Sequence, residues 1–262
     1  MKRIMAFGVF DFLHQGHINF LRQAKRRGAY LVVSVARDAN VFEAKGRLPV
    51  FPEKERLRMV QKLDFVDEAV LGGLDNPWAH ILEHKPDIIA LGYDQRAYLA
   101  SDAKGLEKEL RKRGLETKVL RLRKYKNYKT GKIRKISGKV QRNIGRGTKL
   151  GFPTANLKVE FDYPEGVHLA TVSLRERSSK QSQYHALAFI GPAKTFGESD
   201  KKLEVYILDF NGDLYGKRIE VELIRKIRDN KKFGSAKELI NQMKKDEKFA
   251  RNYFKGYNVN TI

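Results

Sequence analysis

The first half of the chain alternates short apolar runs with segments whose apolar residues recur every three or four positions. Residues 30–36 (YLVVSVA) form an apolar, β-branched run of the length of a buried strand. By contrast, Ile18, Leu21 and Ala24 recur at helical spacing. The pattern predicts strands at 3–7, 30–36, 65–71, 87–91 and 118–122, and helices at 17–27, 52–63, 78–84 and 105–113. Alternating strands and helices indicate a parallel sheet covered by helices, with ligands at the carboxyl ends of the strands.

The pattern changes near Lys124, where a stretch rich in lysine and arginine separates the two halves. Beyond it, short runs are divided by turn signals such as Asn211-Gly212-Asp213. We expect strands at 136–141, 167–174, 184–190, 203–210 and 218–226, and a closing helix over 235–253 with Leu239, Ile240, Met243 and Phe249 on one face. This half indicates an antiparallel barrel, and a boundary near Lys135 gives two domains, 1–134 and 135–262.

Composition narrows the class of protein. The 262 residues are 41% hydrophobic and include no cysteine, which suits a globular protein and excludes disulfides, thiolate metal sites and a cysteine nucleophile. No apolar run is long enough to cross a bilayer, and the chain starts on a strand-like pattern rather than a signal peptide. We therefore expect a cytoplasmic protein without a membrane partner. The formal net charge of +22 attracts polyanions, which include nucleic acids and nucleotide substrates alike.

Residues 8–17 (GVFDFLHQGH) join the first strand to the first helix. A small residue at Gly8 lets the backbone approach a phosphate, and the helix start offers free N–H groups and a positive dipole end. His14 and His17 are three positions apart, so both can face the same phosphates and neutralise charge on a leaving pyrophosphate. The residues alone leave two alternatives open: a plain turn with two surface histidines, or half of a metal site without an obvious third ligand.

The H-x-G-H pattern resembles the signature of nucleotidylyltransferases, and more closely the cytidylyltransferase-like group with its archaeal-type FAD synthetases. The similarity covers about residues 4–123 in five ordered blocks: GVFDFLHQGHINFL, VARD, KGRLPV, EKERLRMV and KPDIIALGYDQ. It implies a Rossmann-like fold in which His14 and His17 contact the triphosphate catalytically. It also implies nucleotide contacts from Gly8, Phe10, Asp11, Lys45, Arg47, Gly92, Asp94, Gln95, Thr130 and Arg134. The family's Ser/Thr-rich closing signature is KTGKIR here, which keeps Thr130 and Arg134 but lacks the serines.

A second glycine-rich stretch, residues 145–156 (GRGTKLGFPTAN), opens the other half. Closely spaced glycines free the backbone to wrap a phosphate, and Arg146 and Lys149 add positive charge. The Gly-Lys-Ser/Thr ending of a Walker A loop is absent. Thr154 and Asn156 offer neutral oxygen ligands that suit Mg²⁺ shared with ATP phosphates. A glycine-rich turn followed by an extended strand is the alternative reading of the same residues.

The string GxxxGxxLGFPTANL is similar to the signature of the riboflavin kinase family, and the similarity covers about residues 137–254. It implies a six-stranded antiparallel barrel with a C-terminal helix and an Mg²⁺ site at Thr154 and Asn156. It also implies that Glu204 is the catalytic carboxylate that accepts the proton of the ribityl 5′-hydroxyl. Implied nucleotide and flavin contacts come from Gly145, Arg146, Gly147, Lys149, Gly151, Pro153, Arg228 and Phe233. The chain departs from the family at His168, where tyrosine is usual, and at Ala193-Lys194, where Arg-Pro is frequent.

Together the two resemblances predict an enzyme of FAD biosynthesis. Riboflavin and ATP would give FMN, and FMN with a second ATP would give FAD and pyrophosphate, with Mg²⁺ as cofactor. One alternative is a riboflavin kinase fused to a nucleotidylyltransferase of other specificity, for CTP or another phosphorylated acceptor. Another is a basic nucleic-acid-binding protein, but that reading leaves two ordered catalytic signatures unexplained, so we expect small-molecule partners. His80, His84 and His185 match no motif and are expected to pack or to lie on the surface.

Overall fold

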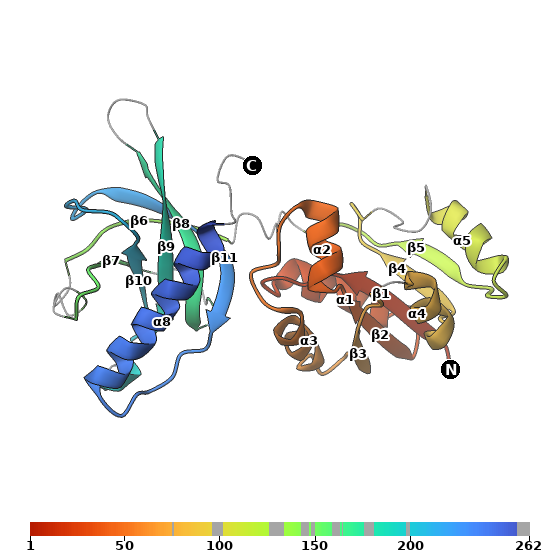
Figure 1. Ribbon diagram of the computed structural model, residues 1–262. Coiled ribbons are helices and arrows are strands. Elements are labelled where there is room, and N and C mark those ends of the chain that lie inside the picture. Colours follow the sequence, from red (N-terminus) through yellow and green to blue (C-terminus); the bar gives the residue numbers. More distant parts are fainter. Residues whose placement is uncertain are drawn as a thin grey trace. The chain divides into compact units, whose positions relative to one another are not determined.

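The computed structural model describes residues 1–74, 76–95, 102–125, 134–142, 147, 150–158, 163, 165–175, 181–197 and 200–255. The chain divides into two compact units, Met1–Lys132 (unit 1) and Ile133–Ile262 (unit 2). Figure 1 labels their elements. Among the helices of the described segments, none combines the length and the apolar character that a membrane span requires.

Unit 1 is a five-stranded parallel sheet in the order β3-β2-β1-β4-β5. Its strands are β1 (Arg3–Gly8), β2 (Tyr30–Val35), β3 (Glu68–Leu71), β4 (Ile88–Leu91) and β5 (Lys118–Arg121), and its helices are α1 (Gln15–Lys25), α2 (Asp38–Lys45), α3 (Glu53–Gln61), α4 (Pro77–His84) and α5 (Ala103–Arg111). The predicted parallel α/β fold is confirmed.

Both faces of this sheet are buried. On β1, Ile4 and Ala6 pack in the cluster with α1 and α3, whereas Met5 packs in the cluster with α4 and α5. Strands buried on both faces read as continuous apolar runs, which accounts for the pattern of β2. Because β2 and β4 flank β1 on opposite sides, the order of the strands reverses at β1. The carboxyl ends of β1 and β4 therefore border the crevice in which open α/β sheets bind ligands.

Helix α2 (Asp38–Lys45) is missing from the prediction made on the sequence. Only Val41 of this helix is buried, so no apolar stripe marks it. The helix ends at Gly46, whose φ of +66° is a left-handed conformation that glycine adopts without strain. As a result, Lys45 lies in the last turn of a helix and not in a loop.

Unit 2 is a six-stranded antiparallel sheet in the order β6-β11-β8-β9-β10-β7. Its elements are β6 (Lys135–Lys139), β7 (Thr154–Leu157), β8 (Gly166–Arg175), β9 (Gln181–Gly191), the 3-10 helix η1 (Lys194–Phe196), β10 (Lys202–Ile207), β11 (Arg218–Arg228) and α8 (Ala236–Lys255). Gln141, just beyond β6, forms an antiparallel bridge with Asn156 of β7. This bridge joins the two edges of the sheet, and the predicted six-stranded barrel is confirmed.

Helix α8 packs across one face of this sheet, as Figure 1 shows. Its inward residues are Asp246, Ala250 and Phe254, which follow each other at a spacing of four. The prediction that Phe249 lies on the buried face is wrong, because its side chain is 52% exposed. Leu239 and Met243 contribute instead to the cavity described below.

The fully buried His168 gives unit 2 an expected sensitivity to acid. Burial, and then the nearby charge of Lys226, lower the pKa of His168 to about 3. An unfolded chain takes up this proton near pH 6.5, whereas the folded state resists it until about pH 3, so stability falls as pH falls through this range. Between pH 7 and pH 5 we expect this one group to lower the free energy of unfolding by about 2 kcal/mol. Urea denaturation followed by far-UV circular dichroism should show a shallower pH dependence for His168→Gln than for the parent. Equal pH dependences would contradict the assignment.

Candidate active sites

The turn after β1 is shaped by two buried aromatic rings. Phe10 and Phe12 have φ values of +53° and +49°, a left-handed conformation that bulky residues adopt only where the surroundings enforce it. A Cβ added to Gly8 would lie 2.7 Å from the ring of Phe10, so this position accepts only glycine. Phe10 is 2% exposed and packs in the core beneath the turn. Its contact with a nucleotide stays a prediction.

Asp11 also holds the turn. It is buried, and its two carboxylate oxygens accept hydrogen bonds from the backbone N–H groups of Val50 and Phe51, at 3.0 and 3.1 Å. These bonds tie the turn to the segment that follows Lys45 and Arg47. Asp11 therefore has a positioning role, and its direct contact with a nucleotide stays a prediction.

His14 and His17 form a stacked pair at the start of α1. Their ring centroids are 3.8 Å apart with an interplanar angle of 14°. His14 is the N-cap: its Nδ1 accepts from the backbone N–H groups of Gly16 and His17, at 3.1 and 3.3 Å. The Nδ1 of His17 in turn accepts from the backbone N–H of His14 at 3.5 Å. With Nδ1 accepting, the proton of each neutral ring belongs on Nε2.

Burial keeps both rings neutral at pH 7. Burial lowers the pKa of His14, and burial, then His14 and Lys45, lower the pKa of His17 to about 3. The charge of Lys45 thus acts on His17, and the two lie near each other as the sequence suggests. Arg47, by contrast, is exposed. Two Nε2–H donors beside a lysine, at a helix N-terminus, make a binding surface for a polyphosphate.

The turn after β4 closes the other side of the crevice. Gln95 donates from Nε2 to the carbonyl of Phe7 at 3.3 Å, and its Oε1 accepts from the N–H of Gly92 at 3.1 Å. Arg121, at the end of β5, donates to the carbonyls of Gly92 and Gln95, both at 2.8 Å. Gln95 therefore fixes the turn, and Asp94 is left exposed at its tip. No motif in the sequence marks Arg121, because its partners are backbone atoms of a distant turn.

Arg56 of α3 is a buried hub for the same crevice. Its side chain is 0% exposed, pairs with Asp38 at 2.8 Å and donates to the carbonyl oxygens of Val9, Ala36 and Phe51. It thereby joins the β1 turn, the end of β2 and the segment after α2. No residue of the sequence prediction plays this part.

Replacing Arg56 by methionine should destabilise unit 1 by about 3–5 kcal/mol, because it leaves Asp38 without its buried partner and three carbonyls without their donor. The only tryptophan, Trp78, lies in unit 1, so its fluorescence during urea denaturation reports the change. Arg58→Met in the same helix removes an exposed arginine and should have little effect. A stability close to that of the parent would show that the ion pair and hydrogen bonds of Arg56 do not stabilise unit 1.

In unit 2, the register of β7 and β10 gathers the predicted metal and base residues. Glu204 is paired directly with Asn156, and Tyr206 with Thr154. Since alternate residues of a strand share a face and directly paired residues have Cβ atoms about 5 Å apart, these four side chains form one cluster. Asn156 donates from Nδ2 to the carbonyl of Thr154 at 3.2 Å, which makes Oδ1 its coordinating atom.

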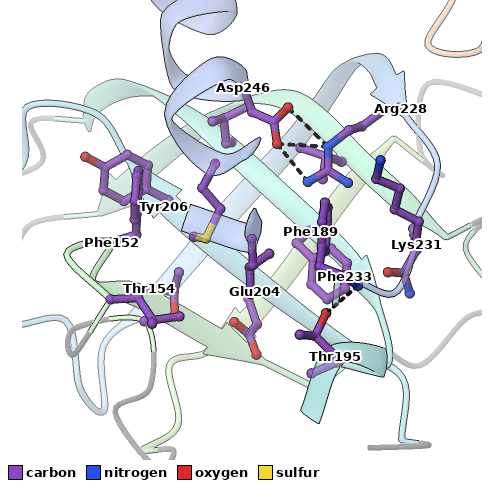
Figure 2. A pocket seen from close by; sticks show the side chains of 18 of the residues that line it. Phe152, Thr154, Phe189, Thr195, Glu204, Tyr206, Arg228, Lys231, Phe233 and Asp246 are labelled. Atoms are coloured by element: carbon purple, nitrogen blue, oxygen red, sulfur yellow. Dashed lines mark hydrogen bonds and ion pairs between the residues drawn. The ribbon is translucent and has the colours of Figure 1, made fainter. Parts of the chain in front are cut away.

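A cavity of about 150 Å³ opens beside this cluster. Figure 2 shows Glu204 and Thr154 on its floor. Its aromatic walls come from Phe152, Phe189, Phe196, Tyr206 and Phe233. Flat apolar walls with a few polar groups are typical of a site for an aromatic ligand.

Two glycines shape the turn that leads into the cavity. A Cβ added to Gly147 would meet the carbonyl of Phe152 at 2.4 Å and Oγ1 of Thr154 at 2.8 Å, so no other residue fits there. Gly151 has a φ of +84°, in the left-handed region. Pro153 is exposed. The close approach of Gly147 to Thr154 sets the wall beside the predicted metal ligands.

The opposite end of the cavity carries a buried ion pair. Arg228 bonds Asp246 through Nε at 2.9 and 3.1 Å and through its NH2 group at 2.7 Å, and Gln242 donates to the same carboxylate at 2.9 Å. Phe233 lies with its ring centroid 5.8 Å from the Arg228 guanidinium. Figure 2 shows Arg228 and Phe233 at the cavity together, with Asp246 as the ion-pair partner of the arginine. Their contact with a nucleotide or flavin stays a prediction.

The remaining predicted residues divide into two groups. Thr130, Gly145, Arg146 and Lys149 lie outside the described residues. Arg134 is described and contradicts its prediction as a nucleotide ligand of the first domain: it is buried in unit 2, where Nε donates to the carbonyl of Leu223 at 3.0 Å. Its guanidinium stabilises the barrel.

Comparisons with known proteins match the two units to two families. The family model described as "Cytidylyltransferase-like" matches residues 5–136, and that described as "Riboflavin kinase" matches residues 130–254. An FAD synthase from Aciduliprofundum boonei is 47% identical over 140 residues, which cover 53% of this chain and 91% of that protein. An FAD synthase from Archaeoglobus profundus is 50% identical over 123 residues, 47% of this chain and 76% of that protein. Both predicted resemblances are confirmed.

Among solved structures, a riboflavin kinase from Trypanosoma brucei aligns with 26% sequence identity and a TM-score of 0.34. It covers 46% of this chain and 79% of its own. The score is too low to add to the assignment.

Proposed function

This chain belongs to the cytidylyltransferase-like family, its curated relatives are FAD synthases, and it carries a riboflavin kinase domain, so we propose that it makes FAD from riboflavin in two steps. Unit 2 transfers the γ-phosphoryl group of ATP to riboflavin, which gives FMN. Unit 1 transfers AMP from a second ATP to FMN and releases pyrophosphate. The observation that carries the proposal is the register that sets Glu204 opposite Asn156 at an aromatic cavity.

In the first step, Glu204 is the general base. Its carboxylate accepts the proton of the ribityl 5′-hydroxyl as that oxygen attacks the γ-phosphorus, and ADP leaves. The aromatic walls hold the flavin ring, so that the flexible ribityl chain reaches toward Glu204. The glycine-rich turn around Gly147 supplies backbone beside the phosphates. Positioning and charge stabilisation account for most of the rate in such a transfer.

The oxygen donors of Thr154 and Asn156 fit a magnesium ion. They are neutral, stand on one face of β7 and lie beside the base, which suits an ion that keeps several waters and shares phosphate oxygens. When bound there, Mg²⁺ would neutralise charge on the terminal phosphates of ATP.

In the second step, His14 and His17 bind the triphosphate of ATP in unit 1. Their Nε2–H groups donate to phosphate oxygens, and Lys45 and the N-terminus of α1 add positive charge. These groups stabilise the negative charge that grows on pyrophosphate when the phosphate of FMN attacks the α-phosphorus. A neutral imidazole pair stabilises this charge by hydrogen bonding, which refines the charge neutralisation expected from the sequence.

Chromatography of flavins after incubation of the full chain with riboflavin, ATP and Mg²⁺ tests the proposal. We expect FMN to accumulate first and FAD to follow. FMN without FAD would support the kinase activity of unit 2 but not the adenylyl transfer by unit 1. Unit 1 would then be assayed with CTP or with another phosphorylated acceptor, by pyrophosphate release. The absence of both products would contradict the proposal for both units.

A further inference from the structure

Helix α4 carries two histidines and a glutamate whose ligand atoms converge. One ligand atom each of His80, Glu83 and His84 lies within 4.8 Å of the other two. Residues three and four apart share a helix face, so the H-x-x-E-H spacing brings them together. The sequence had assigned these histidines to packing or surface. The cluster lies on helix α4 and includes none of the residues of the two proposed active sites.

A fourth donor comes from a different element. Glu68, the first residue of β3, places Oε1 4.0 Å from Nδ1 of His84. Glu68 stands outside the group of three whose ligand atoms lie within 4.8 Å of one another, so it must move toward them to complete the set. Two imidazoles and two carboxylates are a ligand set for a borderline divalent metal such as Zn²⁺. In a tetrahedral site with bonds of about 2.0–2.1 Å, the donors stand about 3.3–3.5 Å apart. Metal binding therefore requires the side chains of Glu83, which is exposed, and Glu68 to move inward.

Outer groups already orient two of the four ligands. Nε2 of His80 lies 3.0 Å from Oγ of Ser34, on β2. Tyr30 Oη donates to the second carboxylate oxygen of Glu68 at 3.3 Å. Metal-binding histidines and carboxylates characteristically have such partners, which fix the ring tautomer and the carboxylate orientation. With Nε2 of His80 engaged by Ser34, Nδ1 is the atom directed to the metal.

We propose that His80, Glu83, His84 and Glu68 form a Zn²⁺-type metal site that fastens α4 to the β2–β3 side of the sheet in unit 1. The site is structural: four protein ligands close the coordination sphere. It is distinct from the Mg²⁺ site proposed at Thr154 and Asn156, whose oxygen donors suit a harder ion.

The test is a titration of the full chain, first stripped with EDTA, with Co²⁺ followed by displacement with Zn²⁺. We expect one equivalent of Co²⁺ to give the visible absorption of a tetrahedral complex, and Zn²⁺ to abolish it, while a large excess of Mg²⁺ does not. The emission of Trp78, which lies in α4 two residues before His80, should shift on addition of Zn²⁺.

Glu83→Gln and His80→Gln should each weaken Zn²⁺ binding by about tenfold or more. Glu83 is exposed, so its replacement should leave the fold intact. Weaker binding in Glu83→Gln therefore cannot be attributed to misfolding, as it could be in the histidine variant. His185→Gln, a histidine of unit 2 stacked on Phe254, is the matched control and should bind as the parent does. Absence of tetrahedral Co²⁺ binding, or equal affinity in all variants, would overturn the proposal.

Discussion

Replacing Glu204 by glutamine is expected to lower the rate of FMN formation by about 10²–10⁴-fold while leaving FAD formation from added FMN unchanged. Glutamine keeps the size and the hydrogen-bonding capacity of the side chain, but it cannot accept the proton of the attacking hydroxyl. The pairing with Asn156 and the walls of the cavity are preserved, so the flavin and ATP should still bind. The loss should therefore fall on kcat more than on KM.

The two reactions of one chain provide the internal control for this variant. If Glu204→Gln disturbed folding in general, FAD formation from FMN would fall as well. Glu220→Gln is the matched substitution: Glu220 lies on β11, is partly exposed and pairs with Lys135 at 3.1 Å, away from the cavity lining. We expect both of its activities to match the parent. If Glu204→Gln formed FMN at nearly the parental rate, Glu204 would not be the general base.

The sequence predicts the fold of unit 1 well because its signal is local. Apolar runs such as residues 30–36 identify strands buried on both faces, and Ile18, Leu21 and Ala24 mark a helix without reference to anything distant. Helix α2 escapes the same analysis since only Val41 of it is buried. The resemblance to a family also cannot separate residues that contact a ligand from those that support them: the bonds of Asp11 to the backbone of Val50 and Phe51 are visible only in the structure.

In unit 2 the individual site residues can be predicted from the sequence, but their proximity in space cannot. Thr154, Asn156 and Glu204 are identified by resemblance, yet about 50 residues of chain separate the two strands, and only the register of β7 and β10 brings the side chains together. The partner of Arg228 cannot be predicted for the same reason, because Asp246 lies on a different element, helix α8. Phe249 shows the limit of helical periodicity: an apolar residue one position away from the inward row is exposed.

Replacing His14 by asparagine should lower FAD formation from FMN and ATP by about 10²–10³-fold and leave FMN formation unchanged. The imidazole has two tasks in the structure: Nδ1 caps helix α1, and Nε2–H is the proposed donor to the triphosphate. Asparagine is among the best N-cap residues, so it retains the first task and loses the second. The assay is FAD formation by chromatography, with the kinase reaction of the same sample as the measure of intact protein.

His14→Ala separates the two tasks by comparison with His14→Asn. Alanine removes the cap as well, at a cost of about 1 kcal/mol of stability that Trp78 fluorescence can follow in urea. If phosphate binding is the essential task, both variants lose FAD formation equally, although only His14→Ala is less stable. If capping is the essential task, His14→Asn should retain most of the activity. The hydrogen bond that Nδ1 of His17 accepts comes from the backbone N–H of His14, so it can form in both variants, whereas the stacking of the two rings is lost in both. Activity in His14→Asn close to that of the parent would therefore rule out the ring of His14 as a ligand of the triphosphate.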